Sequence, residues 1–322
     1  METNPKKKKS SWKKTAFKAA GLVVGLLILW FMVKDIIDNW ESVVPYLAGM
    51  RVPLFLLSVI LYGLAFLFTG YNWTWLLWKM EAGPGRREYL NAHMVSALAR
   101  YIPGGIWSIV GKAYLCNKKG VSAQATTVSI ILEYVFQIAS SGLFFVVLIP
   151  FLFQGGENTW LAAVCFLAAG AALLLLPRCI DLGIRVLSGI MKKDCGDIRL
   201  KPAFVYQALL RYVGAWLVTG TGLLVLVAAF SDFDLLQGVC LVLSYPVSWV
   251  AGFLSPSPNG MGIREGILKI LLGERQAHEL VLLIVVTTRI WTILGEIAAF
   301  SGFKLYYWIT GRRRRHAGIS GS

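Results

Sequence analysis

Nine charged residues lie within stretches of this sequence that are otherwise apolar, and their types limit the chemistry that the chain can do. Six are basic and three are acidic: Arg100, Lys112, Glu133, Arg211, Arg264, Glu265, Lys269, Arg289 and Glu296. A charged side chain inside a bilayer is costly, so such residues face a cavity or a partner of opposite charge. If each acid pairs with one base, three bases remain. That surplus predicts an anionic ligand.

Phosphate is the anion that best suits this set, because the planar guanidinium of arginine binds two phosphate oxygens at once. Two Pro-Gly breaks, at 100–105 and 255–262, would add backbone N–H groups and helix N-termini that favour anions. We therefore expect these residues to form a substrate site: Arg100, Pro103, Gly104, Gly105, Glu133, Arg211, Pro258, Gly260, Gly262, Arg264, Glu265, Arg289 and Glu296. Lys112 and Lys269 lie near the ends of the broken segments, which favours anchoring at the membrane interface.

Other kinds of site have little support in the sequence. The five cysteines and three histidines show no metal-ligand spacing, and we interpret them as packing or surface residues. No constellation of catalytic residues is evident. The sequence predicts neither a metal ion nor a cofactor.

The elements that position these charges are membrane helices. Of the 322 residues, 57% are hydrophobic and 15% are charged, against about 25% charged in an average soluble domain. This composition excludes a soluble or disordered chain and predicts an all-α polytopic membrane protein. Apolar runs long enough to span the hydrocarbon core lie at about 16–33, 54–78, 124–150, 159–177, 204–230 and 278–305.

The two remaining apolar regions, about 89–112 and 235–273, are interrupted by proline and glycine, which break helices. We interpret them as re-entrant hairpins, because irregular backbone in a membrane must be buried in protein or line a cavity. The order of spans and hairpin then repeats with opposite direction in 16–153 and 154–308, which predicts an inverted-topology repeat. A bundle of ordinary helices with two proline kinks is the alternative.

Charge placement predicts the orientation of the chain. With both termini in the cytoplasm, 23 basic residues face the cytoplasm and three, Lys34, Arg51 and Arg275, face outward. The basic tails, 1–15 and 309–322, flank apolar spans, so they indicate topology and contact with anionic lipid, and no nucleic-acid partner.

The broken segments also carry a family resemblance. Ser255-Pro256-Ser257-Pro258-Asn259-Gly260-Met261-Gly262-Ile263-Arg264-Glu265-Gly266 resembles the SPGGLGxRE-type element of the lysylphosphatidylglycerol synthase transmembrane region, a flippase-like family of integral membrane proteins. The segment from Arg100 to Lys112 is similar to the Pro-Gly element of that family's first half, and Glu133 and Arg289 fall where it carries polar residues. Pro258-Asn259 departs from the consecutive glycines that are more usual there.

The resemblance implies a multi-pass protein of the bacterial plasma membrane that moves an anionic or aminoacylated phospholipid, or a lipid-linked headgroup, between leaflets. In full-length relatives a soluble domain synthesises the lipid from aminoacyl-tRNA. This chain ends at Ser322 without room for such a domain, so we expect no phosphatidylglycerol lysyltransferase activity from it despite the kinship. Two alternatives stay open. One is a membrane enzyme on a lipid-linked substrate, with Glu133 or Glu265 as general base. The other is a non-catalytic partner of a cytoplasmic lipid-modifying synthase, docked through 178–201.

Overall fold

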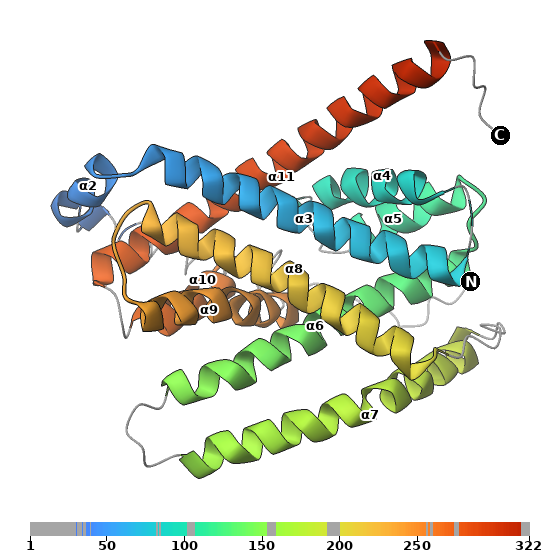
Figure 1. Ribbon diagram of the computed structural model, residues 1–322, viewed down its shortest axis with the longest axis horizontal. Helices are drawn as coiled ribbons and strands as arrows, with labels where there is room; N and C mark the ends of the chain where they lie inside the picture. The colour runs from blue at the N-terminus through green and yellow to red at the C-terminus, as the bar shows by residue number, and fades with distance from the viewer. Residues whose placement is uncertain are drawn as a thin grey trace, which may run out of the picture.

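The computed structural model describes Trp30, Lys34, Ile37, Asp38, Gly83, Ser257 and residues 40–81, 85–101, 107–152, 159–191, 200–255, 260–273 and 277–316. Within this part of the chain every regular element is a helix, as the composition predicts (Figure 1). Their bounds are α2 (Trp40–Ala48), α3 (Val52–Met80), α4 (Arg86–Ala97), η1 (Leu98–Tyr101), α5 (Trp107–Asn117), α6 (Ala123–Leu152), α7 (Thr159–Met191), α8 (Pro202–Ala228), α9 (Leu235–Leu254), α10 (Ile263–Gly273) and α11 (His278–His316).

Six of these helices are long and apolar enough to cross a membrane: α3, α6, α7, α8, α9 and α11. Four of them contain the predicted spans that begin at 54, 124, 159 and 278, and α8 covers the span predicted at 204–230 except for its last two residues. The span predicted at 16–33 lies outside the described residues, apart from Trp30. The protein is therefore a multi-pass helical membrane protein.

The two broken regions each fold as a pair of helices that pack on one another. In the first region α4 and α5 have 12 and 11 residues, about 18 Å each at 1.5 Å per residue, and neither is long enough to cross. In the second region α10 has 11 residues, but α9 has 20 and meets the length of a span. The two regions thus differ in the length of their first helix, which the sequence pattern does not predict.

Helices α3 and α8 pack along each other at the centre of the molecule, where α11 and α9 join them (Figure 1). At two places where these helices cross, their backbones lie so close together that only glycine fits. A Cβ at Gly220 of α8 would lie 2.3 Å from the Val242 carbonyl oxygen of α9, and one at Gly63 of α3 would lie 3.0 Å from the Gly295 carbonyl oxygen of α11. Helix α7 lies at the edge of the bundle and is mostly exposed.

Polar contacts link the connecting segments at each end of the bundle. At one end the Arg51 side chain, just before α3, donates to Asp232, just after α8, over 2.8 Å. This guanidinium holds the pKa of the Asp232 carboxyl below its usual range. At the other end of α3, Ser122 donates to Glu81, and Arg87 donates to the Tyr307 carbonyl over 2.9 Å. The segments assigned to each side of the membrane by the charge count are therefore grouped together in space.

Candidate functional site

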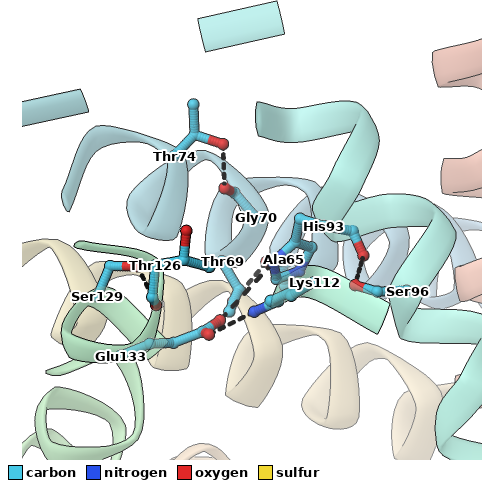
Figure 2. A network of polar contacts seen from close by, with 10 residues as sticks. All are labelled: Ala65, Thr69, Gly70, Thr74, His93, Ser96, Lys112, Thr126, Ser129 and Glu133. Atoms are coloured by element: carbon cyan, nitrogen blue, oxygen red, sulfur yellow. Dashed lines mark hydrogen bonds and ion pairs between the residues drawn. The ribbon is translucent and has the colours of Figure 1, made fainter. Parts of the chain in front are cut away.

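The first buried charge cluster joins three helices of the amino-terminal half. Glu133 of α6 accepts a hydrogen bond from the Lys112 ammonium of α5. The other oxygen of the carboxylate lies 3.7 Å from Nδ1 of His93 in α4. The three residues are between 2% and 6% exposed. Figure 2 shows that they point toward one another, with Thr69 of α3 close by. We call this set the 93–112–133 cluster.

Helix α3 forms an aromatic wall on this cluster. The Lys112 ammonium lies 4.5 Å from the ring centroid of Trp73, an arrangement that stabilises a cation over an aromatic face. The His93 ring lies 5.7 Å from that of Trp73 and 5.9 Å from that of Phe66, between centroids. A Cβ at Gly70 would lie 2.9 Å from Cδ2 of His93, so the glycine provides the space in which the imidazole sits.

The second cluster joins α10 and α11 in the carboxy-terminal half. Glu265, 1% exposed, pairs with the Arg289 guanidinium and also accepts a 2.8 Å hydrogen bond from the Gly262 N–H. Glu265 therefore caps the first turn of α10 while it orients Arg289. Positive φ angles at Gly260 and Gly262, 66° and 80°, allow the break that precedes this turn.

Arg264 lies beside this pair and is 9% exposed. Its guanidinium carbon is 4.4 Å from the ring centroid of Tyr245 in α9. The Arg264 charge is repelled by that of Arg289 and attracted by those of Glu265 and Glu296. One terminal nitrogen of Arg264, one of Arg289 and the Tyr245 hydroxyl are buried without a hydrogen-bond partner in the part of the chain that is described. Buried donors of this kind are rare in proteins and indicate an acceptor that binds there.

The two ion pairs occupy corresponding places with their charges exchanged. Each joins the short helix after a break to the long helix that follows, α5 to α6 and α10 to α11. Glu265 follows Lys112 by 153 residues, and Arg289 follows Glu133 by 156. In the first half the base is on the short helix, whereas in the second half the acid is.

The structure brings together Gly260, Gly262, Arg264, Glu265, Arg289 and Glu296 among the predicted site residues, and places Glu133 in the first cluster. Arg211 lies elsewhere, with its guanidinium carbon 4.8 Å from the Trp75 ring centroid. The Arg100 side chain, Pro103, Gly104, Gly105 and Pro258 lie outside the described residues.

Two residues at the first cluster differ from the sequence-based interpretation. Lys112 is predicted as an interface anchor, yet it is 6% exposed and paired with Glu133. His93 is predicted as a packing residue, yet it faces the Glu133 carboxylate. The signal that could have found His93 is the low hydropathy of its segment, 86–97, within an apolar chain.

No group of three or more His, Cys, Asp and Glu residues in the described part could hold a metal ion.

Comparison with known proteins agrees with the architecture. The family model of the lysylphosphatidylglycerol synthase TM region matches residues 18–299. No curated protein and no solved structure shows a significant match to the chain. The matched segment includes both ion pairs and both broken regions. The chain therefore belongs to the family of the lysylphosphatidylglycerol synthase TM region.

Proposed function

We propose that this protein moves a phospholipid with an anionic headgroup between the leaflets of the bacterial plasma membrane, and that Arg264 and Arg289 bind the headgroup phosphate. The observation that carries the proposal is that Arg264 and Arg289 each have one buried terminal nitrogen without a hydrogen-bond partner among the described residues, Arg264 being 9% exposed and the Arg289 side chain 22% exposed. Glu265 pairs with Arg289, and the charges of Glu265 and Glu296 lie near Arg264, yet one terminal nitrogen of each arginine donates no bond to these carboxylates. An anion between the two guanidinium groups would bind both nitrogens. Phosphate oxygens match the geometry of guanidinium donors.

The route follows from the placement of these groups. The headgroup would contact Arg264 at the break before α10, while the acyl chains stay in lipid. Glu265 would hold Arg289 in position through both carboxylate oxygens, one on the guanidinium and one on the Gly262 N–H. This role leaves Glu265 poorly placed as a general base.

The movement itself would use the inverted repeat. In this proposal α4–α5 and α9–α10 are opposed re-entrant hairpins, and alternating exposure comes from motion of one repeat against the other. The shortness of α4, α5 and α10 and the exchanged ion pairs support it. Both termini would lie in the cytoplasm, with the basic tails at the anionic inner surface.

Reconstituted vesicles provide the test. Phosphatidylglycerol that carries a nitrobenzoxadiazole dye is placed in both leaflets, and dithionite is added outside to bleach accessible dye. The parent protein should bring the inner pool to the outside. Arg264→Gln should slow this about 10- to 100-fold, because a hydrogen bond to a charged group contributes about 1.5–3 kcal/mol. A phosphate-free glycolipid with the same dye should not be moved.

Arg185→Gln is the matched control, because Arg185 is an arginine on α7 whose side chain is 68% exposed and paired with Asp181. It should move the lipid at the parent rate. If folded Arg264→Gln protein also moves the lipid at the parent rate, the proposed site is wrong.

A further inference from the structure

The phosphate site proposed above does not include the 93–112–133 cluster, which concentrates three titratable side chains in the interior. His93 comes from α4, Lys112 from α5 and Glu133 from α6. Ionisable groups buried in membrane proteins mark ion pathways and proton relays, because their burial is too costly to serve no purpose. Histidine is the one side chain whose ordinary titration falls between about pH 5 and 8.

We propose that the 93–112–133 cluster is a proton-binding site, in which uptake of one proton by His93 weakens the bond between Lys112 and Glu133 and so loosens the α4–α5 pair from α6. The proton comes from the aqueous phase and binds an imidazole nitrogen. No other bond forms or breaks covalently. The proton site stands on the geometry alone, whereas its effect on lipid movement rests on the proposed function.

The charge balance of the cluster explains the effect. With a neutral imidazole, the Lys112 ammonium and the Glu133 carboxylate sum to zero. Protonation adds a second cation 3.7 Å from the same carboxylate, so imidazolium and ammonium compete for one acid and the cluster gains a charge of +1. Because the three side chains are between 2% and 6% exposed, water screens the repulsion between the two cations only weakly, which makes the competition strong.

Among the described residues, the helices packed against the cluster place no second carboxylate beside it, and the Cys116 thiol of α5 is the further titratable group near Lys112. Glu133 is the only charged residue of α6, α9 has none, and Lys79 of α3 lies at the end of its helix.

On α8, Arg211 lies over Trp75, and the buried Tyr212 hydroxyl is the titratable group that faces Glu133. The other charged residues of the neighbouring helices α4 and α7 are Arg86, Arg87, Glu88, Arg178, Asp181 and Arg185. Of these, Glu88 pairs with Lys119 and Asp181 with Arg185 near the surface.

The corresponding ion pair in the second half of the molecule would not respond to pH in this way. It joins Arg289 to Glu265, and a guanidinium stays charged at every physiological pH. One break is thus tied to its long helix by a bond that a proton can weaken, and the other by a bond that it cannot. This asymmetry would make the α4–α5 side the part that responds to pH.

Histidine NMR tests the proton site directly, because the chain has three histidines. Protein labelled in its histidine rings and carrying His278→Gln and His316→Gln retains one imidazole signal, that of His93. We expect this signal to change between its neutral and charged forms within pH 5 to 8 in lipid nanodiscs. Glu133→Gln should move the change to lower pH, because the carboxylate no longer stabilises the imidazolium. A signal that stays constant from pH 5 to 8 in the parent background overturns the proposal.

The link to lipid movement is measured in the vesicle assay over the same pH range. The rate should rise as pH falls, by up to about tenfold per pH unit, the slope for a single proton. His93→Gln should abolish the pH dependence, whereas His278→Gln, at the exposed start of α11, should retain it. A pH-independent rate in the parent overturns the coupling. Absence of lipid movement at every pH overturns the proposed function, and the NMR titration then decides the proton site alone.

Discussion

At the scale of residues, the Lys112–Glu133 pair shows how a membrane protein keeps two opposite charges in its interior. The pair is buried on all sides, and the Trp73 face stabilises the ammonium further. Removal of one partner leaves the other charge buried without compensation, and this costs more than the pair contributes. Replacement of either residue alone should therefore destabilise the fold more than replacement of both residues at once.

A double-mutant cycle measures this dependence. Lys112→Met or Glu133→Gln alone should each destabilise the protein by about 3–5 kcal/mol, the usual cost of breaking a buried pair. The double variant should recover much of that loss. Thermal unfolding in detergent, followed by tryptophan fluorescence, gives the comparison. Losses that simply add in the double variant would contradict the account.

The exposed Asp181–Arg185 pair provides the control for that cycle. Its partners are also joined by an ion pair, but they lie on the surface of α7 with 30% and 68% of their side chains exposed. Removal of either one should change stability by no more than about 1 kcal/mol, because water screens the charge that remains.

The same scale shows where prediction from sequence succeeds. Arg264, Glu265 and Arg289 are charged residues in apolar stretches, so their cost in lipid singles them out, and the structure places them together. His93 carries no such signal, and Lys112, although one of the nine charged residues in apolar stretches, is interpreted from the sequence as an interface anchor. Lys112 ends an apolar run, where snorkelling explains it equally well, and the neighbour that defines each of them, Glu133, lies 21 residues or more away in the sequence.

At the scale of elements, helix α9 lies so close to α8 at Gly220 that a side chain there would not fit. The Val242 carbonyl oxygen occupies the place where a side chain at Gly220 would begin. A sequence reveals the glycine but not its partner, since the contact depends on the register of two helices. The same limit applies to α9 itself, whose break is visible in the sequence although its full length of 20 residues is not.

Gly220→Ala tests this crossing. The added Cβ would lie 2.3 Å from a backbone oxygen of α9, a distance at which something must shift. We expect the two helices to separate at a cost of about 1–3 kcal/mol, the range for overpacked cores. Thermal unfolding in detergent measures the loss. Gly142→Ala on α6 is the matched control: its Cβ would meet open space, so it should stabilise the helix by about 0.5–1 kcal/mol. Equal stability of the two variants would contradict the close approach.

At the scale of the whole molecule, the polar contacts divide the connecting segments into two sets. Arg51 and Asp232 belong to one end of the bundle, and Glu81, Ser122 and Tyr307 belong to the other. The charge count predicts that the second set faces the cytoplasm. Hydropathy acts over long segments, so five of the candidate spans are predictable from the sequence, whereas α9 is not predicted as a span of its own and the direction of the spans stays a prediction.

Cysteine labelling in intact cells tests that assignment. In a variant without the five native cysteines, Asp232→Cys should react with a membrane-impermeant maleimide added outside, and Lys118→Cys should react only after the cells are opened. Activity in the vesicle assay verifies that each variant is folded. The reverse pattern of labelling would invert the predicted orientation of the whole chain.

The length of α11 has a consequence for the lipid around the protein. Its 39 residues rise about 58 Å, roughly twice the thickness of the hydrocarbon core, so the helix continues past the membrane surface as one rigid rod (Figure 1). The last turns carry four consecutive arginines, 312–315, and an arginine near an anionic membrane surface is attracted to it by about 1 kcal/mol. We therefore expect this end of the chain to enrich the surrounding ring of lipid in negative headgroups. The local supply of anionic lipid would then depend on the protein as well as on the average composition of the membrane.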